Sequence, residues 1–481
     1  MIRVLTGGLF VFLSAAAGSA QLSNQVAYTL LEGSSLLDQC LICGRPDILQ
    51  PLRGTFELVL AQDTPPFTAY AVRNLDFNTS PGWLERHLQG EGIYTRFEEF
   101  AILQDIYLAL QVKDNYTNLL ACFTNDTRAV QKPFPLIEAD LTQSNGTWLQ
   151  TFSLHLLAAP VREIWFSTRK GFTSTNRFAP TNQVSAGDLL SNRGRVVKRN
   201  SDLAGGLGIM PPVPDLGLDA VQVAPRAEIL FSIPGDAFSE RLGLLHHGDL
   251  LSSLGSVVRR NQQLLDAFHP LSTNDAGLDA LQLLPGGEIL FSITTNVSLT
   301  ASFVLHHGDI LSDQGRVFLT QQQLLEKFHP TVSGQDFGLD AFQILPWGEI
   351  WFSVEQSFTD SQLGLVQEGD LLSNFGYRVF RNQDLLAAFV PADPGADYGL
   401  DALFVVTDTR LARPPPRLLN TTRTGALLRL QWEGEGDVFQ LETAPRLSGP
   451  WSACGEIVPD LSSDVSFDPR SGAGFYRLRQ W

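Results

Sequence analysis

The chain has 481 residues, a formal net charge of −17 and four cysteines. This length exceeds what a single hydrophobic core usually supports, so we expect about three domains. The strong negative charge excludes nucleic-acid binding through phosphate neutralisation, because that mode requires clustered lysine and arginine. Four cysteines are too few for a disulfide-dense scaffold, so the domains must be held together by apolar burial and strand pairing.

Residues 1–20 have the pattern of a secretory signal peptide. Arg3 provides a short basic start, an apolar run extends from Val4 to Ala17, and Gly18-Ser19-Ala20 supplies small residues at a cleavage point. An uncleaved N-terminal anchor is the alternative. No later stretch reaches about 18 uninterrupted apolar residues, so we expect no transmembrane segment in the mature chain. It should be secreted: extracellular, at the cell surface or periplasmic.

Residues 21–150 predict an N-terminal β-rich module, because strand-like runs such as 55–60 and 106–112 are separated by Pro, Gly and Asn clusters. Cys40 and Cys43 form a C-x-x-C pair that resembles half of a zinc ribbon, but no second pair follows. A secreted protein meets an oxidising compartment, so a disulfide between these two cysteines is the favoured interpretation. A zinc site and a redox-active pair are the alternatives.

The central part of the chain is a repeat. The tetrad G-L-D-A recurs every 60 or 61 residues, and two further sequences, E-I-[LW]-F-S and G-D-[LI]-L-S, accompany it. Self-similarity at a fixed period marks a repeat architecture in which each copy is one structural unit. The starts are Glu163, Glu228, Glu288 and Glu349 for E-I-[LW]-F-S; Gly187, Gly248, Gly308 and Gly369 for G-D-[LI]-L-S; and Gly217, Gly277, Gly338 and Gly399 for G-L-D-A.

Each copy predicts four short antiparallel strands. Runs of Ile, Val, Leu and Phe bounded by turn residues are typical of strands, and the tight P-G-G and D-Q-G turns favour hairpins. A four-stranded unit of about sixty residues suits one blade of a β-propeller. In the clearest copy the strands are expected at 280–284, 288–293, 308–312 and 316–320.

A short helix is expected after the fourth strand. Gln322–Phe328 should be helical, beginning at Thr320 or Gln321, because its apolar residues share one face. In the first copy the corresponding residues, Asp202–Gly206, contain two glycines and are expected to be loop.

The copies together predict a β-propeller-like domain of four repeats over residues 151–408. The first copy should begin near Thr151, with Ser153–Leu157 in place of the opening strand. A fifth opening strand, Asp401–Val406, has no continuation. It is therefore expected to close the ring by pairing with the first copy.

Residues 409–417 and 418–481 predict a linker and a small C-terminal domain. Arg413–Arg417 contains three consecutive prolines and should be stiff. The strand-like runs that follow, such as 427–432 and 438–442, resemble a fibronectin-III-like β-sandwich, and similar tails are common at the ends of secreted bacterial proteins. The expected fold class is therefore all-β throughout.

The four Asp-Ala pairs of G-L-D-A are similar to those of the hemopexin family. Its four-bladed propellers place such a pair on the innermost strand of each blade and carry a short helix beyond the outer strand. The resemblance covers residues 151–408 and implies an ion site on the propeller axis, for which calcium is the candidate. The residues to which it assigns this role are Asp219, Asp279, Asp340 and Asp401.

Two interpretations of these aspartates are open from the residues alone. If the opening strand lines the axis, four carboxylates, or the carbonyls of the neighbouring alanines, could converge and hold calcium. Alternatively, each aspartate caps the preceding loop by accepting hydrogen bonds from backbone N–H groups, as in an Asx turn. The aspartates of G-D-[LI]-L-S are expected to form turns in the same way; they are Asp188, Asp249, Asp309 and Asp370.

Paired histidines precede two of the G-D-[LI]-L-S sequences. Adjacent residues on a strand point to opposite faces, so neither pair can chelate a metal as a unit. The other two copies carry Ser185-Ala186 and Gln367-Glu368 at these positions, which breaks any ring of ligands. We therefore expect the histidines to be structural or surface residues; they are His246, His247, His306 and His307.

The chain has no G-x-S-x-G, no H-E-x-x-H and no phosphate-binding loop sequence, so no catalytic residue is assigned. We expect a secreted, non-enzymatic binding or scaffolding protein that uses the ring faces to contact an extracellular protein or polysaccharide. The alternative is an extracellular polysaccharide hydrolase or lyase with its site on one ring face. A cleft lined by converging carboxylates with raised pKa values would favour that alternative.

Overall fold

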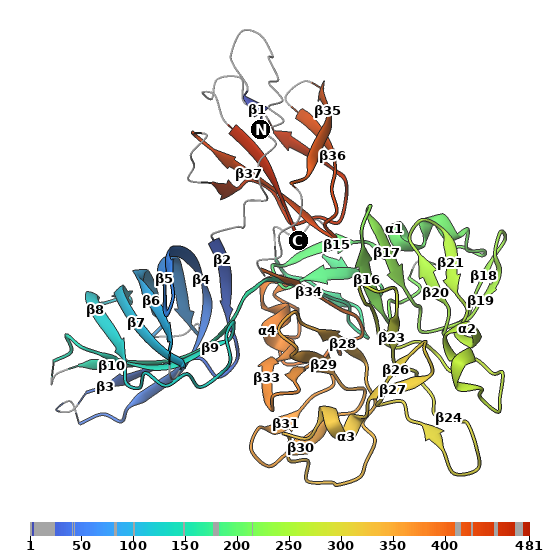
Figure 1. Cartoon of the computed structure of the whole chain (residues 1–481), viewed down its shortest axis with the longest axis horizontal. Helices are drawn as coiled ribbons and strands as arrows, with labels where there is room; N and C mark the ends of the chain where they lie inside the picture. The colour runs from blue at the N-terminus through green and yellow to red at the C-terminus, as the bar shows by residue number, and fades with distance from the viewer. Residues whose placement is uncertain are drawn as a thin grey trace.

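The computed structural model of the chain describes residues 2–3, 25–40, 42, 44–80, 84–99, 102–147, 150–176, 182–213, 215–408, 415–424, 427–446, 451–466 and 475–481. The protein is all-β, as predicted, with only short helices. It consists of an N-terminal closed sheet, a ring of four small sheets and a C-terminal pair of sheets (Figure 1).

The N-terminal domain is an antiparallel sheet that closes on itself. Its strands are β2 (Gln25–Leu30), β3 (Ser35–Gln39), β4 (Ile48–Thr64), β5 (Phe67–Thr79), β6 (His87–Glu98), β7 (Ile102–Lys113), β8 (Asn118–Asn125), β9 (Ile137–Gln143) and β10 (Thr151–Ala159). From β3 to β10 each strand pairs with the next. β10 also pairs with β2 and β3, and both β2 and β3 pair with the long β4. β2 and β3 therefore share one strand position between β10 and β4, and this closes the sheet.

Side chains fill the inside of this closed sheet. Alternate residues of β7 are buried, as expected of a strand with one face toward a core. The cavity that remains beside Phe56, Phe77 and Leu108 has a volume of about 20 Å³, little more than one water molecule requires. The closed sheet is therefore a packed core with no space for an organic ligand at this position.

The segment expected to open the first repeat belongs to the closed sheet instead. Thr151–Ala159 is β10, which pairs with β9 and β3. Phe152 and Leu154 are buried in the core of the closed sheet, and this apolar contact fixes the strand there. The boundary expected at residue 151 is thus displaced: the ring begins at β11 (Val161–Phe166), directly after Pro160.

The ring consists of four four-stranded antiparallel sheets, numbered 1 to 4 in chain order. Their innermost strands, β34, β16, β22 and β28, lie side by side in turn around the ring. Sheet 1 contains β34 (Leu403–Thr407), β11, β14 (Leu189–Ser191) and β15 (Arg195–Lys198); sheet 2, β16 (Val221–Ala224), β17 (Glu228–Phe231), β20 (Leu250–Ser252) and β21 (Ser256–Arg259); sheet 3, β22 (Leu281–Leu283), β23 (Ile289–Phe291), β26 (Ile310–Ser312) and β27 (Arg316–Leu319); sheet 4, β28 (Ala341–Ile344), β29 (Ile350–Ser353), β32 (Leu371–Ser373) and β33 (Tyr377–Phe380).

The last strand of the ring closes it by pairing with the first. β34 runs antiparallel to β11, with Trp165 opposite Phe404 and Phe166 opposite Leu403. This confirms the pairing expected of the fifth opening strand. Because β10 lies in the closed sheet, β34 supplies the opening strand that the first repeat lacks.

Serine side chains join each sheet to the next. The serine of E-I-[LW]-F-S is fully buried in every copy, and its hydroxyl donates to the carbonyl of the leucine in the next G-L-D-A. The fourth of these bonds returns to sheet 1, so the set runs round the whole ring. The bonds are Ser167 to Leu218 (2.7 Å), Ser232 to Leu278 (2.7 Å), Ser292 to Leu339 (3.1 Å) and Ser353 to Leu400 (2.9 Å).

Glutamines on the inner strands form a second set of bridges. The side chain of Gln282 accepts from the backbone N–H of Ile344 at 2.7 Å and donates to its carbonyl at 3.1 Å. Gln343 makes the same pair of bonds with Val405. Between sheets 2 and 3 the side chain of Gln222 accepts from the N–H of Leu283 at 3.2 Å. In sheet 1 the equivalent residue is Phe404, which lies in one apolar cluster with Val221 and Val223 of sheet 2, so the fourth junction is apolar.

We predict that Gln282→Leu lowers the free energy of unfolding by about 1–3 kcal/mol, because it leaves both backbone groups of Ile344 without their partner. Gln262, whose exposed side chain bonds only to Thr273, provides the control. Gln262→Leu should change stability by less than about 0.5 kcal/mol. Denaturant unfolding of both variants measures the difference, and equal values would contradict a bridging role.

A short helix follows the fourth strand in each copy. The helices are α1 (Asn200–Ala204), α2 (Asn261–Leu265), α3 (Gln321–Leu324) and α4 (Asn382–Leu386). Thr320 caps α3, as predicted: its hydroxyl accepts from the N–H of Gln323 at 3.3 Å, and the Gln323 side chain accepts from the N–H of Thr320 at 2.9 Å. The prediction of a loop at Asp202–Gly206 was wrong. Buried Leu203 anchors α1 there despite the following glycines.

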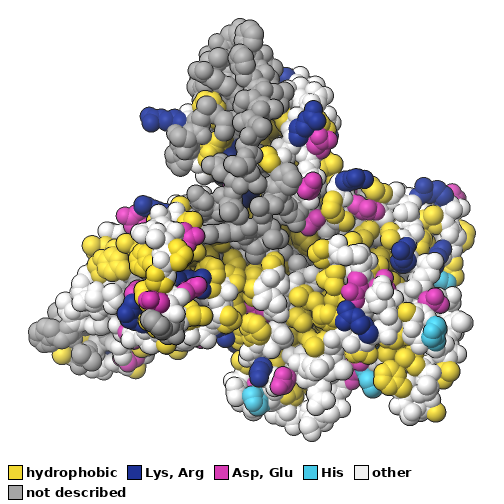
Figure 2. All heavy atoms as spheres, in the orientation of Figure 1, with side chains coloured by type: hydrophobic (Ala, Val, Ile, Leu, Met, Phe, Trp, Pro, Cys, Tyr) yellow, Lys and Arg dark blue, Asp and Glu magenta, His cyan; other side chains and the backbone are white. Residues whose placement is uncertain are grey.

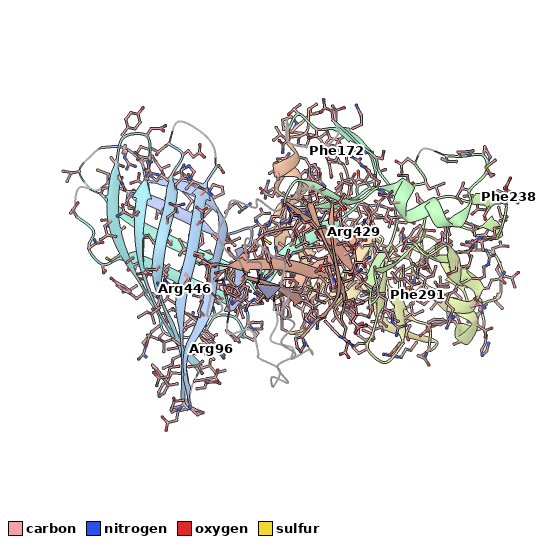
Figure 3. The ribbon with its side chains drawn as sticks, turned by 90° about the horizontal axis from the view of Figure 1, so that it is seen from above. Arg96, Phe172, Phe238, Phe291, Arg429 and Arg446 are labelled. Carbon is pink, nitrogen blue, oxygen red and sulfur yellow. The ribbon has the colours of Figure 1, made fainter. Side chains whose placement is uncertain are left out.

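Each repeat also contains a two-stranded hairpin that the sequence pattern did not indicate. These hairpins lie between the second and third strands of each sheet: β12 (Phe172–Thr173) with β13 (Gln183–Val184), β18 (Ala237–Ser239) with β19 (Gly243–Leu245), β24 (Val297–Ser298) with β25 (Val304–Leu305) and β30 (Phe358–Asp360) with β31 (Gly364–Val366). Figure 3 shows Phe238 on one hairpin at the outer edge of the ring, whereas Phe291 of β23 lies inside. Their strands of two or three residues are too short to give a periodic signal.

The C-terminal domain contains two sheets around a small core. One consists of β35 (Arg417–Thr424), β36 (Leu427–Glu433) and β39 (Ser462–Ser466), and the other of β37 (Phe439–Ala444), β38 (Ser452–Ala453), β40 (Phe475–Gln480) and the edge strand β1 (Ile2–Arg3). Trp432 and Phe439 pack together between the sheets, with ring centroids 5.9 Å apart. β1 lies within the predicted signal peptide, and most of the predicted linker lies outside the described residues.

Asp408 joins the three domains. This residue follows β34, is only 3% exposed, and accepts hydrogen bonds from the N–H of Ala27 in the closed sheet at 2.7 Å and from Arg162 in the ring at 2.8 Å. Arg479 of the C-terminal domain donates to its other oxygen at 2.5 Å. Burial alone would raise the pKa of Asp408, but the two guanidinium groups outweigh burial and hold the pKa below its usual value.

We predict that Asp408→Asn lowers stability by about 3–5 kcal/mol at neutral pH, because two buried guanidinium groups lose their counter-charge. A lowered pKa gives stability that is present above the pKa of the unfolded state and is lost as pH falls through the folded pKa. The difference from wild type should therefore shrink in acid. Thermal melts at pH 7 and pH 4 measure it. Asp460→Asn removes the carboxylate that pairs with Lys198 at a more exposed site. It should lower the free energy of unfolding by less than about 1 kcal/mol.

Candidate functional site at the ring axis

Ring closure brings the four G-L-D-A aspartates together at the axis. Each follows the same glycine turn at the start of an innermost strand, and none is more than 7% exposed. Burial, followed by the neighbouring carboxyl groups, raises their pKa values well above the usual range. For Asp401 burial outweighs the nearby Arg169 and raises the pKa to about 7. We call Asp219, Asp279, Asp340 and Asp401 the axial cluster.

The axial aspartates do not make the Asx turns that were one interpretation of the sequence. That role belongs to the aspartate two residues before each glycine, which accepts from the glycine N–H at 2.9–3.1 Å. These residues are Asp215, Asp275, Asp336 and Asp397. The repeated hexapeptide is therefore D-x-G-L-D-A, and its first aspartate was a signal that the sequence analysis missed.

Each axial aspartate keeps one buried carboxyl oxygen without a hydrogen-bond partner among the described residues. These atoms are Asp219 Oδ2, Asp279 Oδ2, Asp340 Oδ2 and Asp401 Oδ1. A buried polar atom without a hydrogen bond costs free energy. Four such atoms at one place therefore mark the cluster as a candidate functional site.

Apolar residues close the axis next to the cluster. The alanines that follow the aspartates line this space with Val221, Leu281, Phe342 and Leu403, and it has no room for a water molecule. The carbonyls of Ala220 and Ala280 accept from the N–H groups of Ser232 and Ser292 in the neighbouring strands. These alanine carbonyls are therefore already used in strand pairing.

Glu355, which follows β29 of sheet 4, lies beside the cluster. Its carboxylate is hydrogen-bonded to the side chain of Asp279 and, at 3.1 Å, to Nδ1 of His307. Burial would raise the pKa of Glu355, but these two hydrogen bonds outweigh burial and lower it. The pKa of Asp279 is shifted the opposite way, because burial and the neighbouring carboxyl groups raise it.

Arg169 provides the positive charge at the cluster. This residue follows β11 of sheet 1, and its Nε lies 3.5 Å from Asp401 Oδ1. One Nη donates to Glu368 at 3.0 Å and to the carbonyl of Glu355 at 3.1 Å. Burial lowers the pKa of Arg169, but the carboxylates of Asp340, Asp401 and Glu368 outweigh burial and raise it.

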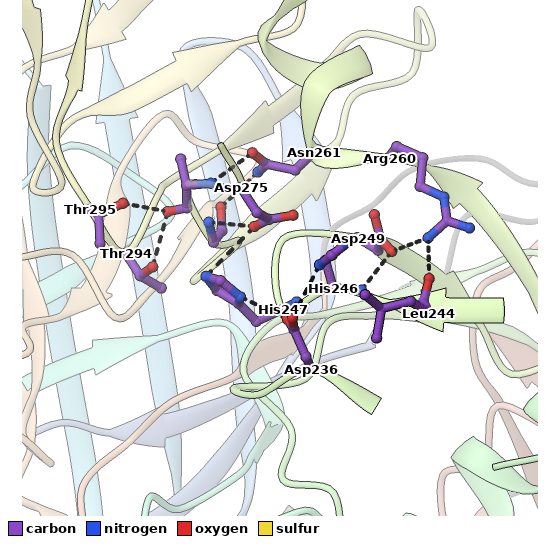
Figure 4. Close-up of polar contacts among 12 residues, drawn as sticks. Asp236, Leu244, His246, His247, Asp249, Arg260, Asn261, Asp275, Thr294 and Thr295 are labelled. Atoms are coloured by element: carbon purple, nitrogen blue, oxygen red, sulfur yellow. Dashed lines mark hydrogen bonds and ion pairs between the residues drawn. The ribbon is translucent and has the colours of Figure 1, made fainter. Parts of the chain in front are cut away.

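The paired histidines hold the loops around this face through carboxylates. Figure 4 shows His246 and His247 against Asp236, each at 3.1 Å, with His247 also 3.6 Å from Asp275. In the next copy His307 contacts Asp336 at 3.4 Å. The structure agrees with a structural role. The aspartates of G-D-[LI]-L-S form turns as expected: for example, Asp249 accepts from the N–H of His246 at 2.9 Å.

The axial cluster has the right donors for calcium but not the arrangement. Carboxylate oxygens suit this ion, and four of them lack a hydrogen-bond partner among the described residues. Within the described part of the chain, however, no three Asp, Glu, His or Cys side chains converge closely enough to hold a metal ion. A guanidinium also lies beside Asp401. The calcium site expected from the hemopexin resemblance stays a prediction.

The cysteines divide into two groups. Cys40 is disulfide-bonded, which leaves no thiolate at this position for zinc. Cys43 lies outside the described residues, so its pairing with Cys40 stays a prediction. Cys122 and Cys454 carry free thiols.

No protein-family model matches the chain, and no curated protein matches it. Among solved structures, the extracellular domain of a putative hybrid two-component system from B. thetaiotaomicron is similar over 87% of this chain and 74% of that chain, with 10% identity and a TM-score of 0.20. A likeness this low carries no conclusion about fold or function. None of the helices in the described residues is long and apolar enough to span a membrane.

We predict that Asp340→Asn makes the protein less sensitive to alkali. A carboxyl whose folded pKa is raised gives stability that is fully present below its unfolded pKa and is lost as pH rises through the folded pKa. Wild type should therefore melt at a lower temperature at pH 8 than at pH 5. The neutral amide should reduce that loss by a few degrees. Asp266→Asn, at an exposed helix end, serves as the control and should track wild type.

Proposed function

We propose that this chain is a secreted, non-enzymatic binding or scaffolding protein that contacts an extracellular protein or polysaccharide through the ring face around the axial cluster. The observation that supports the proposal most is the set of unpartnered, buried carboxyl oxygens beneath a partly exposed charged rim. We call this rim, formed by Arg169, Glu355, Glu368 and His307, the axial face. Its charged side chains are 16–35% exposed, so a partner can reach them.

The same residues argue against polysaccharide hydrolysis. Glycosidases hold two carboxyl groups about 5–9.5 Å apart so that a sugar, and in inverting enzymes a water, fits between them. Asp279 and Glu355 have pKa values shifted in opposite directions, as an acid and a base would, but they are hydrogen-bonded directly to each other. The axis beside them has no room for a water molecule. Cleavage of a polysaccharide at this face, by a hydrolase or a lyase reaction, is therefore the weaker alternative.

The domain arrangement supports a scaffolding role. The N-terminal closed sheet contacts sheet 4, where Arg53 pairs with Asp384 at 2.7 Å, and the C-terminal domain contacts sheet 1, where Lys198 pairs with Asp460 at 2.7 Å. Sheets 2 and 3 lie on the side of the ring away from the N-terminal closed sheet (Figure 1). In the view of Figure 2 acidic and basic side chains are interspersed over the ring, so contact there depends on local pairs rather than on one charged patch.

Retention of the full-length protein on chitosan, dextran, alginate and an immobilised basic protein tests the proposal. We expect retention on chitosan or the basic protein, because the unpartnered carboxyl oxygens of the axial cluster lie beneath the axial face, and no release of reducing ends. Glu368→Gln should weaken retention several-fold. Glu326→Gln, which removes the same charge from an exposed site on the helix side, should leave retention unchanged.

Two results would contradict the proposal. Equal retention of both variants would place binding elsewhere. Release of reducing ends that Asp279→Asn abolishes would establish the hydrolase or lyase instead.

A further inference from the structure

The axial cluster presents an electrostatic problem that the ring must solve. Four aspartates and Glu355 lie together with little exposure to water, where ionised carboxylates strongly repel one another. Four of their oxygen atoms have no hydrogen-bond partner among the described residues. Some positive charge must therefore offset those that ionise, and no group of side chains in the described residues is arranged to hold a metal ion that could supply it.

Arg169 is the residue that breaks the four-fold repeat at this place. It stands two residues after the serine of E-I-W-F-S, where the other copies have Pro234, Thr294 and Glu355. Its stem lies across Gly399, whose φ is +74°, and a Cβ at Gly399 would come within 2.6 Å of Arg169 Cγ. The glycine of the closing G-L-D-A thus leaves the space through which this side chain reaches the axis.

The guanidinium of Arg169 is held from three directions. Asp401 approaches Nε at 3.5 Å, and the Glu368 carboxylate and the Glu355 carbonyl accept from Nη1 at 3.0 and 3.1 Å. Asp401 is the member of the cluster in sheet 1, Glu368 and Glu355 belong to sheet 4, and Arg169 enters from the loop after β11. The charge therefore lies at the junction where the ring closes.

We propose that Arg169 is the resident counter-cation of the axial cluster, occupying the place at which a free cation would otherwise be held. Replacing its guanidinium by an uncharged side chain should convert the cluster into a site for a divalent cation such as calcium. This inference concerns the axial face but does not depend on the proposed binding function, since it describes how the ring offsets its own charge.

Removal of the guanidinium leaves the carboxyl groups with two ways to reduce their repulsion. They can retain protons, or they can share a cation whose flexible coordination accepts carboxylate oxygens at unequal distances. Protons and metal compete for the same oxygen atoms. His307, whose pKa is raised by its hydrogen bond to Glu355, also loses its positive charge as pH rises, so cation binding to the variant should strengthen with pH.

Bound-metal analysis and thermal melts with calcium or with chelator, at pH 6 and pH 8, test the proposal on the full chain. Wild type should carry no stoichiometric metal and melt at the same temperature in both solutions. Arg169→Gln should melt lower in chelator and recover by about 5 °C in saturating calcium, more at pH 8 than at pH 6. Arg169→Lys keeps the charge and should resemble wild type. Arg259→Gln, which removes an exposed charge elsewhere, should show no calcium effect.

Two outcomes would overturn the proposal. One is an Arg169→Gln protein whose melting temperature is the same with calcium and with chelator. The other is wild-type protein that carries about one calcium per chain and is destabilised by chelation, which would return the axis to a metal ion as in the hemopexin resemblance. The wild-type measurement can still contradict the proposal if Arg169→Gln does not fold.

Discussion

The antiparallel pairing of β34 with β11 is the contact on which the ring depends. Without it the four sheets would end in an open edge, and the buried serine of sheet 4, Ser353, would have no leucine carbonyl to meet. Closing the ring joins residues about 240 positions apart, and the entropy of closing so long a loop grows only slowly with its length. The cost is offset by the many equivalent contacts that form once the inner strands meet.

Closure also imposes the charge arrangement at the axis. A repeat that places aspartate at the same point of every inner strand must bring the four carboxyl groups together. Three features reduce this repulsion: burial raises the pKa values of the aspartates, Asp279 and Glu355 share a hydrogen bond, and Arg169 places a guanidinium beside Asp401. The site is thus not four-fold symmetric: its charge is concentrated between sheets 4 and 1, where the chain closes.

The strands of the ring were predictable from the repeat in the sequence, whereas many of the side-chain contacts that join them were not. The apolar runs identified the strands of each sheet and the closing strand. They could not show that Ser153–Leu157 pairs with β9, because a periodic run does not specify its partner. Convergence of the axial aspartates was one of two interpretations of the repeat, and the roles of Gln282, Asp275 and Arg169 were not predicted. Gln282 and Asp275 act through side-chain hydrogen bonds whose partners a repeat period does not specify, and Arg169 acts through a contact across the closing junction.

The hydrogen bond from the N–H of Asp408 to the carbonyl of Pro160 places the entry and the exit of the ring at one point. If the two ends of the protein were pulled apart, the tension would pass from the closed sheet to the C-terminal domain across this point and the β11–β34 pair. Sheets 2 and 3 would carry no load until that pair separated. Most of the ring therefore lies outside the path of the force. Its outer faces can keep their structure while the two flanking domains are under tension.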